Sequence, residues 1–417
     1  MSHALPHLLH LLDLSNVGGI QGSLVNTLSA LQTRYRHTVV NAAAAPAVES
    51  YVQRLAAIGV PVLESAPRPV PVPLGALRRL GRVARTVRVF ALLPRLRPDV
   101  VLLWSVRPRP PFIRAAHRLG SRVIVWDRGV SWLRKPTPSV CRGFALADAI
   151  LCNSHAARRM LQLRWGVTAP VDLCLNAVRP DALPTSAVER ELPRDRPLRL
   201  GFVGRLVPLK GAGLVVAALQ LLRRSGLNVE LHIAGSGPEE AALRSLAQAA
   251  GVTDRVCFRG LVQDMAGFYR DVDLLVCPSL REPFGLVSIE AQASGCPVIV
   301  SAVDGLPETL VHQRTGLAVR PTMPLSRYAD YAGSLTDVPP AVYLPHLDAV
   351  GEPQALNPAD IADAVLSLAS DSQRYQRMSR DAIRHARTAF SFERHVEGAA
   401  AVIDRVLQHA QGAASSQ

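Results

Sequence analysis

Short apolar runs alternate with amphipathic segments along most of the chain. The runs that we expect to form strands cover 7–15, 36–43, 98–105, 121–129 and 148–154 in the first half, and 198–206, 228–237, 256–262, 272–280 and 297–301 in the second. Segments with apolar residues at helical spacing lie between them, at 18–32, 212–226, 238–251 and 286–294. This alternation predicts an α/β fold with two doubly wound, Rossmann-like domains.

The domain limits follow from length and from a polar, Pro-rich stretch at 176–197. A chain of 417 residues is long enough for two domains. We expect an N-terminal domain over 1–185, a linker over 186–197, a second domain over 198–388 and a C-terminal helix over 389–417. In such sheets ligands bind at the carboxyl ends of the strands.

The lengths of the apolar runs and the spacing of the cysteines indicate the cellular compartment. No run of 18 or more apolar residues predicts a membrane span. The first 19 residues lack a cationic start and a small-residue cleavage site, so we expect a buried strand there rather than a signal peptide. Six scattered cysteines without a CxxC pair are typical of a reducing cytoplasm, and favour neither a zinc site nor a disulfide framework.

The positive charge is concentrated in the first half. Residues 1–197 carry 27 Arg or Lys against 11 Asp or Glu (+16), and residues 198–417 carry 20 against 22 (−2), which together give the net +14. The basic stretch 77–98 has helical spacing and suits an amphipathic helix on an anionic membrane surface or near a polyanionic acceptor. An Arg-rich coding bias is the plain alternative. Nucleic acid is disfavoured because the stretch lacks interleaved aromatic residues for base stacking.

The segment REPFGLVSIEAQASGCPVIVS (281–301) places Glu282 and Glu290 eight positions apart. Glu282 falls in a loop after a strand, and Gly285 allows close approach of the backbone to a ligand. The free amides of Gly285, Leu286 and Val287 at the start of a helix suit a diphosphate. The two carboxylates are better suited to sugar hydroxyls than to phosphate.

This pattern indicates a nucleoside diphosphate sugar, with the transferred sugar at Glu282 and the ribose at Glu290. The alternative is a helix with a capping carboxylate and one solvated glutamate.

A second candidate element, GFVGRLVPLKG (201–211), follows a strand and opens a helix. Arg205 and Lys210 would neutralise a diphosphate leaving group without a metal, and Gly204 and Gly211 allow tight backbone. Lys210 is unusual because the chain has 45 arginines and only one other lysine, Lys135. The alternative is a surface helix start with ordinary charges.

Several of these motifs together resemble the GT-B glycosyltransferases of family 4. They are GRLVPLKG, GSGPEEAAL, VCFRGLV, EPFGLVSIEAQASGCPVIVS and GLPETLVHQRTGLAV in the second half, and SNVGGIQGSLVNTL, AILCNSHAARRML and LCLNAVRPD in the first. The resemblance implies retaining transfer from a nucleotide-sugar donor, without a bound metal or other cofactor, to an acceptor hydroxyl in the cleft between an acceptor-binding first domain and a donor-binding second domain. The expected setting is polysaccharide, lipopolysaccharide or glycolipid synthesis, with a saccharide or lipid-linked acceptor.

Carried over position by position, the resemblance places Arg205 and Lys210 at the diphosphate and Glu282 at the donor sugar. Glu290 is implied at the ribose, and the last helix, 391–410, would cross back to the first domain. Gly19 would face the diphosphate or the acceptor. The other implied donor contacts are positions near the base, Gly260, Leu261 and Val262, and backbone positions, Gly204, Phe284, Gly285, Leu286 and Val287.

The chain departs from the family pattern in two places. Many members have a histidine where this chain has Asp127 and Arg128, so Asp127 is expected either to bind a donor or acceptor hydroxyl or to cap a turn. Residues 321–354 look like an insertion where the family usually has a short connection. Two other functions stay open: a GT-B epimerase or phosphorylase, and a non-catalytic scaffold docked on a membrane.

Overall fold

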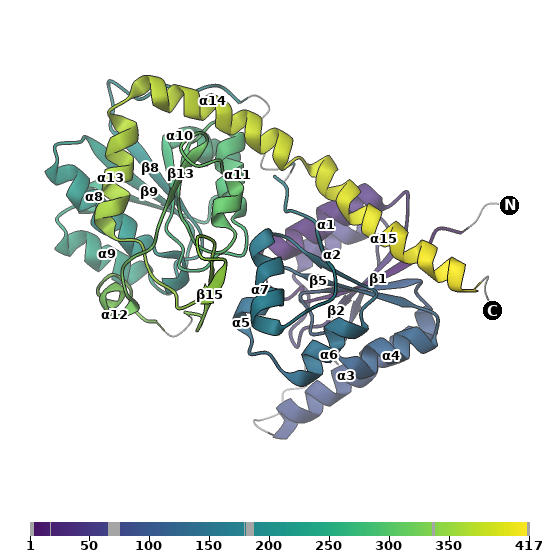
Figure 1. The fold of residues 1–417 in the computed structure, drawn as a ribbon. Coiled ribbons are helices and arrows are strands. Elements are labelled where there is room, and N and C mark those ends of the chain that lie inside the picture. Colours follow the sequence, from purple (N-terminus) through teal and green to yellow (C-terminus); the bar gives the residue numbers. More distant parts are fainter. Residues whose placement is uncertain are drawn as a thin grey trace. The chain divides into compact units, whose positions relative to one another are not determined.

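The computed structural model describes residues 4–414 apart from residues 17, 66–75, 179, 181–186 and 336–337 (Figure 1). The chain folds as two units. Unit 1 comprises Met1–Asn153, Met160–Leu175 and Glu393–Gln417, and unit 2 comprises Ser154–Arg159 and Asn176–Phe392. The chain leaves unit 1 briefly at Ser154–Arg159, leaves it again at Asn176, where the Pro-rich stretch starts, and returns to it after Phe392. Most of the expected linker, 187–197, belongs to unit 2.

Unit 1 contains a seven-stranded sheet in the order β3-β2-β1-β4-β5-β6-β7, and every neighbouring pair is parallel. Parallel neighbours require crossover connections, and helices provide them. The strands are β1 (His7–Leu12), β2 (Arg36–Asn41), β3 (Val62–Glu64), β4 (Val100–Trp104), β5 (Arg122–Asp127), β6 (Ala149–Cys152) and β7 (Val171–Leu173). The helices are α1 (Gly19–Leu31), α2 (Glu49–Ala56), α3 (Ala76–Leu96), α4 (Pro110–Arg118), α5 (Val130–Leu133), α6 (Pro138–Leu146) and, from Met160 onward, α7 (His155–Trp165).

The centre of this sheet contains polar side chains that are buried and paired. Trp104 Nε1 donates a hydrogen bond to His10 Nδ1 at 3.1 Å, and His10 Nε2 lies 3.0 Å from His37 Nδ1. Burial lowers the pKa of His37 to about 4 and that of His10 well below its usual value. Both imidazoles are therefore neutral parts of the core at pH 7.

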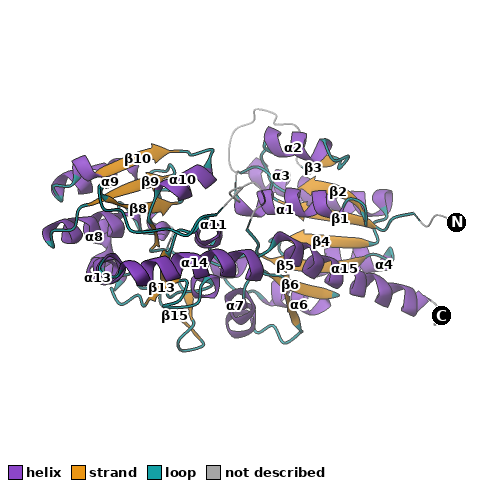
Figure 2. Cartoon of the chain, turned by 90° about the horizontal axis from the view of Figure 1, so that it is seen from above, coloured by secondary structure: helices purple, strands orange, loops and turns teal. Residues whose placement is uncertain are grey.

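Unit 2 contains a six-stranded parallel sheet in the order β10-β9-β8-β11-β12-β13. Figure 2 shows strands grouped in sheets with helices around them in each unit. The strands are β8 (Leu198–Val203), β9 (Val229–Ala234), β10 (Val256–Gly260), β11 (Leu274–Cys277), β12 (Val298–Ser301) and β13 (Gly316–Val319). The helices are α8 (Ala212–Arg224), α9 (Glu240–Ala249), α10 (Met265–Asp271), α11 (Leu286–Ala293), α12 (Leu325–Tyr328), α13 (Pro358–Ala369) and α14 (Ser372–Ala389).

Alternate residues of these strands feed two cores, one on each face of the sheet. Leu274 and Val276 of β11 pack in a cluster with α8 and α13, whereas Leu275 and Cys277 pack in a cluster with α10 and α11. Successive side chains of a strand point to opposite faces, so a strand that is apolar at every position predicts burial on both. The sheet is therefore covered by helices on both sides, as the alternating pattern predicted.

The segment 321–354 is a folded part of unit 2. It contains α12 and the antiparallel hairpin of β14 (Val342–Leu344) and β15 (Ala349–Gly351). Met323 and Ala355 pair at the two ends of the segment, so its ends lie side by side. Tyr328 is fully buried and its hydroxyl donates to Pro208 O at 2.6 Å.

The last helix, α15 (Phe392–Ala414), belongs to unit 1 from Glu393 onward. Arg34 pairs with Glu397 and Asp404, at 3.1 and 2.9 Å, and Tyr35 donates to Asp404. His395 is buried and its Nδ1 lies 2.8 Å from Leu175 O. Polar contacts and a buried imidazole therefore hold this helix to the first Rossmann-like unit.

Helix α3 contains most of the basic stretch predicted to be helical, and its side chains are described from Val83 onward. Val83 and Val87, one turn apart, are each 60% exposed, and Arg88 and Arg95 are also exposed. Among the described residues, no helix combines the length and hydropathy needed to cross a membrane.

Candidate donor site

The candidate site of unit 2 lies where the strand order changes direction. β8 is flanked by β9 on one side and β11 on the other, so the loops after β8 and β11 leave the same edge of the sheet as neighbours. Leu280 N donates to Leu209 O at 2.9 Å and joins the two loops directly. Such switch points are where open α/β sheets bind ligands.

Lys210 and Glu282 form an ion pair across this switch point. Lys210 ends the short 3₁₀ helix η2 (Pro208–Lys210), and Gly211 follows with φ +70°. A Cβ on Gly211 would come 2.6 Å from Pro278 O, so glycine is needed for the two loops to approach. The pair is partly exposed, with 27% of the Lys210 side chain and 17% of the Glu282 side chain open to solvent.

Arg205 lies in the loop directly after β8, on the same edge of the sheet. Its side chain is exposed, and no described residue makes a hydrogen bond or ion pair with its guanidinium. Gly204 precedes it, and the backbone of Gly235 lies so close that a Cβ there would meet Gly204 O at 1.8 Å. The loops after β8 and β9 therefore meet beside an unpaired cation.

Helix α11 begins beside Glu282, at the residue the sequence predicted. Gly285 precedes the helix with φ +111°, and a Cβ there would meet Leu306 at 2.6 Å. Leu286 and Val287 are the first helical residues, so their amides lie at the positive end of the helix dipole. Phe284 is buried against Phe390, with ring centroids 5.6 Å apart, so it offers only backbone to a ligand.

Glu290 lies in the interior of α11 and is 1% exposed. Its Oε2 accepts a hydrogen bond from the Tyr269 hydroxyl at 3.1 Å. The structure thus leaves Glu282 partly exposed and buries Glu290, whereas the sequence suggested that both carboxylates face the ligand. A ribose contact at Glu290 stays a prediction. It requires that a ribose hydroxyl hydrogen-bonds to the Glu290 carboxylate, which already accepts from Tyr269.

The expected base contacts lie after β10, the edge strand. Gly260 has φ +61° and its carbonyl accepts from Gly235 N at 2.7 Å, which joins the ends of β9 and β10. Leu261 is 74% exposed, and Val262 packs against the core cluster that also contains Cys277. An exposed leucine in this position is free to cover a flat ring, and this role stays a prediction.

Sequence reasoning missed Asp304, which holds the Glu282 loop. Asp304 is fully buried with φ +49°, its Oδ2 accepts from Glu282 N at 3.0 Å and its Oδ1 accepts from Tyr343 N at 2.7 Å. Gly305 N also donates to Glu282 O at 3.0 Å. The only signal in the sequence was an Asp-Gly turn after a strand.

The insertion 321–354 reaches both loops of the site. Tyr343 in the hairpin binds Asp304, which binds the Glu282 backbone, and Tyr328 donates to Pro208 at the start of the Lys210 turn. The insertion, for which the sequence indicated no role, thus holds the loops that carry Lys210 and Glu282 through hydrogen bonds to Pro208 and Asp304.

Asp127 and Gly19 lie in unit 1. Asp127 ends β5, is buried, and its carboxylate accepts from Ser131 N at 3.4 Å and from Ser131 Oγ at 2.7 Å. It therefore caps the turn into α5, one of the two roles considered for it. Gly19 is the exposed first residue of α1, preceded by Gly18 as the N-cap. Roles of either residue in a reaction stay predictions.

The buried residue beside Asp127 is Arg128, which lies next to a pair of tryptophans whose ring centroids are 4.3 Å apart. Its guanidinium carbon is 5.4 Å from the ring centroids of both Trp104 and Trp126, and its Nη2 donates to Ser23 Oγ at 2.9 Å. Burial lowers the pKa of Arg128 to about 10, so it keeps its charge at pH 7. This cation organises the centre of unit 1.

Comparison with known proteins finds a matching family model in each half of the chain. The model of Glycosyltransferase Family 4 matches residues 17–182, and that of Glycosyl transferases group 1 matches residues 186–333. A glycosyltransferase from Rickettsia africae superposes with a TM-score of 0.73 at 14% identity, over 97% of this chain and 99% of that one. HepE from Anabaena, solved with UDP and glucose, superposes with a TM-score of 0.70 at 17% identity, over 96% of this chain and 100% of HepE.

The curated relatives are closer in sequence but match over shorter regions. A D-inositol 3-phosphate glycosyltransferase of Mycobacteroides abscessus is 33% identical over 249 residues, 56% of this chain and 55% of the relative. One of Thermomonospora curvata is 30% identical over 292 residues, 64% of this chain and 57% of the relative. The chain thus spans little more than half the length of these relatives.

The two Rossmann-like units and their structural neighbours define a GT-B fold. With a family model matching each half, the chain belongs to family 4 of the GT-B glycosyltransferases.

Proposed function

We propose that this protein transfers a sugar, with retention of configuration, from a nucleoside diphosphate sugar to an acceptor hydroxyl. The observation that carries the proposal is the Lys210–Glu282 pair at the β8/β11 switch point, beside the start of α11. One cation and one carboxylate there match the two chemical parts of such a donor: a diphosphate and a sugar rich in hydroxyls.

The proposed mechanism centres on the leaving diphosphate, which gains negative charge as the glycosidic bond breaks. Lys210, the exposed Arg205 and the first amides of α11 would stabilise that charge more strongly in the transition state than in the ground state. Lys210 already lies against Glu282, so it is oriented before the donor arrives. Glu282 would accept hydrogen bonds from the donor sugar and hold its reactive carbon in place.

The acceptor's proton needs a base, and the donor can provide it. In a front-face displacement, an oxygen of the departing phosphate takes the proton from the acceptor hydroxyl as the new glycosidic bond forms. This route requires no protein base, which suits a chain with Asp127 where many relatives have histidine. It also requires no metal, because two cations and a helix start neutralise the diphosphate.

The nucleotide and the acceptor are proposed from the named relatives. HepE was solved with UDP, glucose and UDP-glucose, which favours a uridine donor. Structural neighbours also include enzymes of lipopolysaccharide synthesis. We therefore place the reaction in the synthesis of a cell-surface polysaccharide, lipopolysaccharide or glycolipid, with a saccharide or lipid-linked acceptor.

Peripheral attachment to an anionic membrane, with the protein on the cytoplasmic side, is part of the proposal. It is supported by the +16 charge of residues 1–197 and by the exposed Val83, Val87, Arg88 and Arg95 on α3. Apolar side chains beside arginines are typical of helices that lie in a lipid interface.

The decisive experiment is nucleotide release from a panel of nucleotide-sugars, with and without acceptor extracts. Acceptor-dependent release with an α-linked product from an α-linked donor supports the proposal. Release of epimerised sugar or of sugar phosphate would instead identify an epimerase or a phosphorylase. A chain that binds no nucleotide-sugar would be a scaffold.

A further inference from the structure

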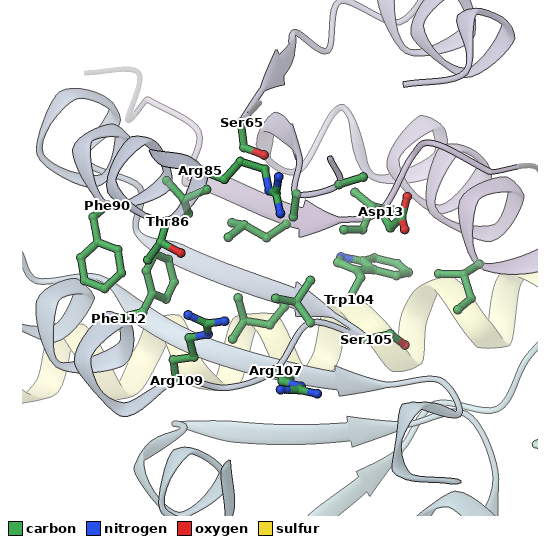
Figure 3. Close-up of a pocket in the computed structure, with 18 of the residues that line it drawn as sticks. Asp13, Ser65, Arg85, Thr86, Phe90, Trp104, Ser105, Arg107, Arg109 and Phe112 are labelled. Atoms are coloured by element: carbon green, nitrogen blue, oxygen red, sulfur yellow. The ribbon is translucent and has the colours of Figure 1, made fainter. Parts of the chain in front are cut away.

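Unit 1 contains a cavity of about 710 Å³ at the carboxyl edge of its own sheet (Figure 3). The residues that follow β1 and β4 line it, and these strands are the neighbours where the order β3-β2-β1-β4-β5 changes direction. This is the switch point of the first sheet, the counterpart of the β8/β11 site. The volume suits a ligand of ordinary organic size.

Among the described residues, four arginines and one acidic side chain line this cavity. The arginines are Arg85 of α3, Arg107 and Arg109 before α4, and Arg134 after α5. Figure 3 shows Arg85 on one side and Arg107 and Arg109 on the other. No described residue makes a hydrogen bond or ion pair with any of these four guanidinium groups.

The acidic side chain is already engaged elsewhere. Asp13 Oδ1 accepts from Ser15 N at 2.9 Å and from Ser15 Oγ at 2.6 Å. Burial and, second, the charge of Arg107 lower the pKa of Arg134, so two of the cations already repel each other. Cations gathered in this way without a carboxylate between them favour an anion.

The rest of the lining is mainly apolar. Phe90 of α3 and Phe112 of α4 meet edge to face, with centroids 5.3 Å apart, at one end of the cavity (Figure 3). Leu103 and Trp104 of β4 lie along it, and the Trp104 indole N–H is already bonded to His10. An apolar group bound here would need no polar partner from these side chains.

The loop that carries Arg107 and Arg109 starts from a strained residue. Ser105 has φ +54°, a conformation that serine rarely adopts, and it is held by its N–H to Trp126 O and by its Oγ, which accepts from Arg128 N. Such backbone is usually kept where it positions functional groups. Here Ser105 turns the chain from β4 into the loop whose Arg107 and Arg109 line the cavity.

We propose that this cavity holds the acceptor, and that the acceptor is a phosphate or diphosphate ester with an apolar organic group. The phosphate lies among Arg85, Arg107 and Arg109, and the apolar group lies along Trp104, Phe90 and Phe112. The role as acceptor rests on the proposed transferase function.

The test is calorimetry on the full chain with octyl phosphate, octyl glucoside, inorganic phosphate and glycerol phosphate, all below micelle concentration. We expect octyl phosphate to bind at least tenfold more tightly than the other three. Lengthening the alkyl chain from butyl to hexyl to octyl should raise affinity by up to about tenfold per two methylenes. Equal binding of octyl glucoside, inorganic phosphate or glycerol phosphate would overturn the proposal.

Matched double variants separate the cavity from general charge. Arg107→Gln with Arg109→Gln should weaken octyl phosphate at least tenfold, and Arg85→Gln should weaken it too. Arg114→Gln with Arg118→Gln removes the same charge from exposed positions of α4 outside the cavity, and should leave binding unchanged. Equal weakening in both double variants would overturn the proposal, provided that circular dichroism shows them folded.

Failure of the transferase function gives a different result. If octyl phosphate binds as expected but no nucleotide-sugar is turned over with any acceptor, the anion cavity stands and the transferase does not. If transfer proceeds to a neutral acceptor and octyl phosphate does not compete, the cavity proposal fails alone.

Discussion

At the switch point of unit 2, a lysine and a glutamate neutralise each other across two loops that hydrogen bonds hold together. At the switch point of unit 1, four arginines surround a cavity and no described residue pairs with them. The same place in the same kind of sheet thus carries a preorganised ion pair in one unit and uncompensated positive charge in the other. The unit with the cavity also contains most of the +16 excess of residues 1–197, because its residues 1–153 carry 20 Arg or Lys against 6 Asp or Glu (+14).

The difference separates two tasks. A site that stabilises charge developing in a transition state benefits from groups that are oriented before the reaction. A site that captures an anionic substrate benefits from charge that is unsatisfied until the substrate arrives, because binding then supplies the missing partner. The first task suits the donor side of a glycosyl transfer and the second suits the acceptor side.

Breaking the pair in unit 2 should have the largest effect. Lys210→Ala and Arg205→Ala are each expected to lower kcat by about 10²- to 10³-fold, since removal of one oxyanion stabiliser costs about 3 kcal/mol. Nucleotide release measures this. Lys135→Ala, which removes the other lysine from an exposed position in unit 1, is the control and should be neutral. Wild-type turnover in a folded Lys210→Ala protein would refute the assignment.

Acid should unfold unit 1 through its buried histidines. Burial lowers the pKa of His37 and of His395 to about 4, below the unfolded value of about 6.5. The unfolded chain therefore binds more protons between these values, so their stabilisation is complete above pH 6.5 and is lost as the pH falls to 4. We expect a loss on the order of a few kcal/mol in this window.

Fluorescence can follow this transition because all four tryptophans lie in unit 1. Denaturant midpoints at pH 7, 5 and 4 give the measurement. His395→Gln should reduce the change of the denaturant midpoint with pH. His409→Gln, at an exposed position of the same helix, should not. Identical slopes in the two variants would contradict the linkage.

Loosening the support of the Glu282 loop should have an intermediate effect. Asp304→Asn replaces one of two accepting oxygens by an amide group that cannot accept from Glu282 N or Tyr343 N. We expect unit 2 to lose about 1–3 kcal/mol of stability and kcat to fall by about tenfold, because Glu282 is no longer held in register. Asp330→Asn, exposed in the insertion, is the control; a stability loss without any change in kcat would show that Asp304 does not position Glu282.

Charge on α3 should matter less per residue and only at a lipid surface. Arg88→Gln with Arg95→Gln should weaken association with anionic vesicles by about 1 kcal/mol per arginine, and added salt should reduce the difference. Arg223→Gln with Arg224→Gln removes the same charge from exposed positions of α8 in unit 2. Equal weakening by the two pairs, or equal binding to neutral vesicles, would argue against a lipid-facing unit 1.

Excess chelator should have no effect on turnover. Lys210, Arg205 and the start of α11 would provide the neutralisation that a divalent ion provides elsewhere. A strict requirement for magnesium or manganese, seen as activity lost with chelator and regained with the metal, would replace this description of the donor site.

Much of the fold was predictable because its signals are local. The apolar runs at 198–206 and 272–280 became β8 and β11, and Gly285 marked the start of α11 at Leu286. The short edge strands β3 and β7, three residues each, were not predicted. Strands of this length contain too little pattern to distinguish them from loop, and only pairing with β2 and β6 defines them.

The candidate donor site was predictable in part for the same reason. A residue that follows a buried strand lies at the sheet's carboxyl edge wherever that strand is placed, so Arg205, Lys210 and Glu282 could be assigned to one edge from sequence. The depth of Glu290 and the cap made by Asp127 could not, because both depend on neighbours, Tyr269 and Ser131, whose side-chain directions the pattern does not encode.

The sequence by itself thus determined the class of fold, the strands and helices that have a clear apolar pattern, and the loops that carry chemistry, since each rests on hydrophobic periodicity and turn residues within a few positions. Tertiary structure alone decided that Lys210 meets Glu282 across 72 residues, that Asp304 and the 321–354 insertion support that loop, and that arginines from three separate segments share one cavity. The physical reason is strand order: β1 lies beside β4 and β8 beside β11, and these pairings arise from how the helices cover both faces of each sheet, which no local stretch specifies.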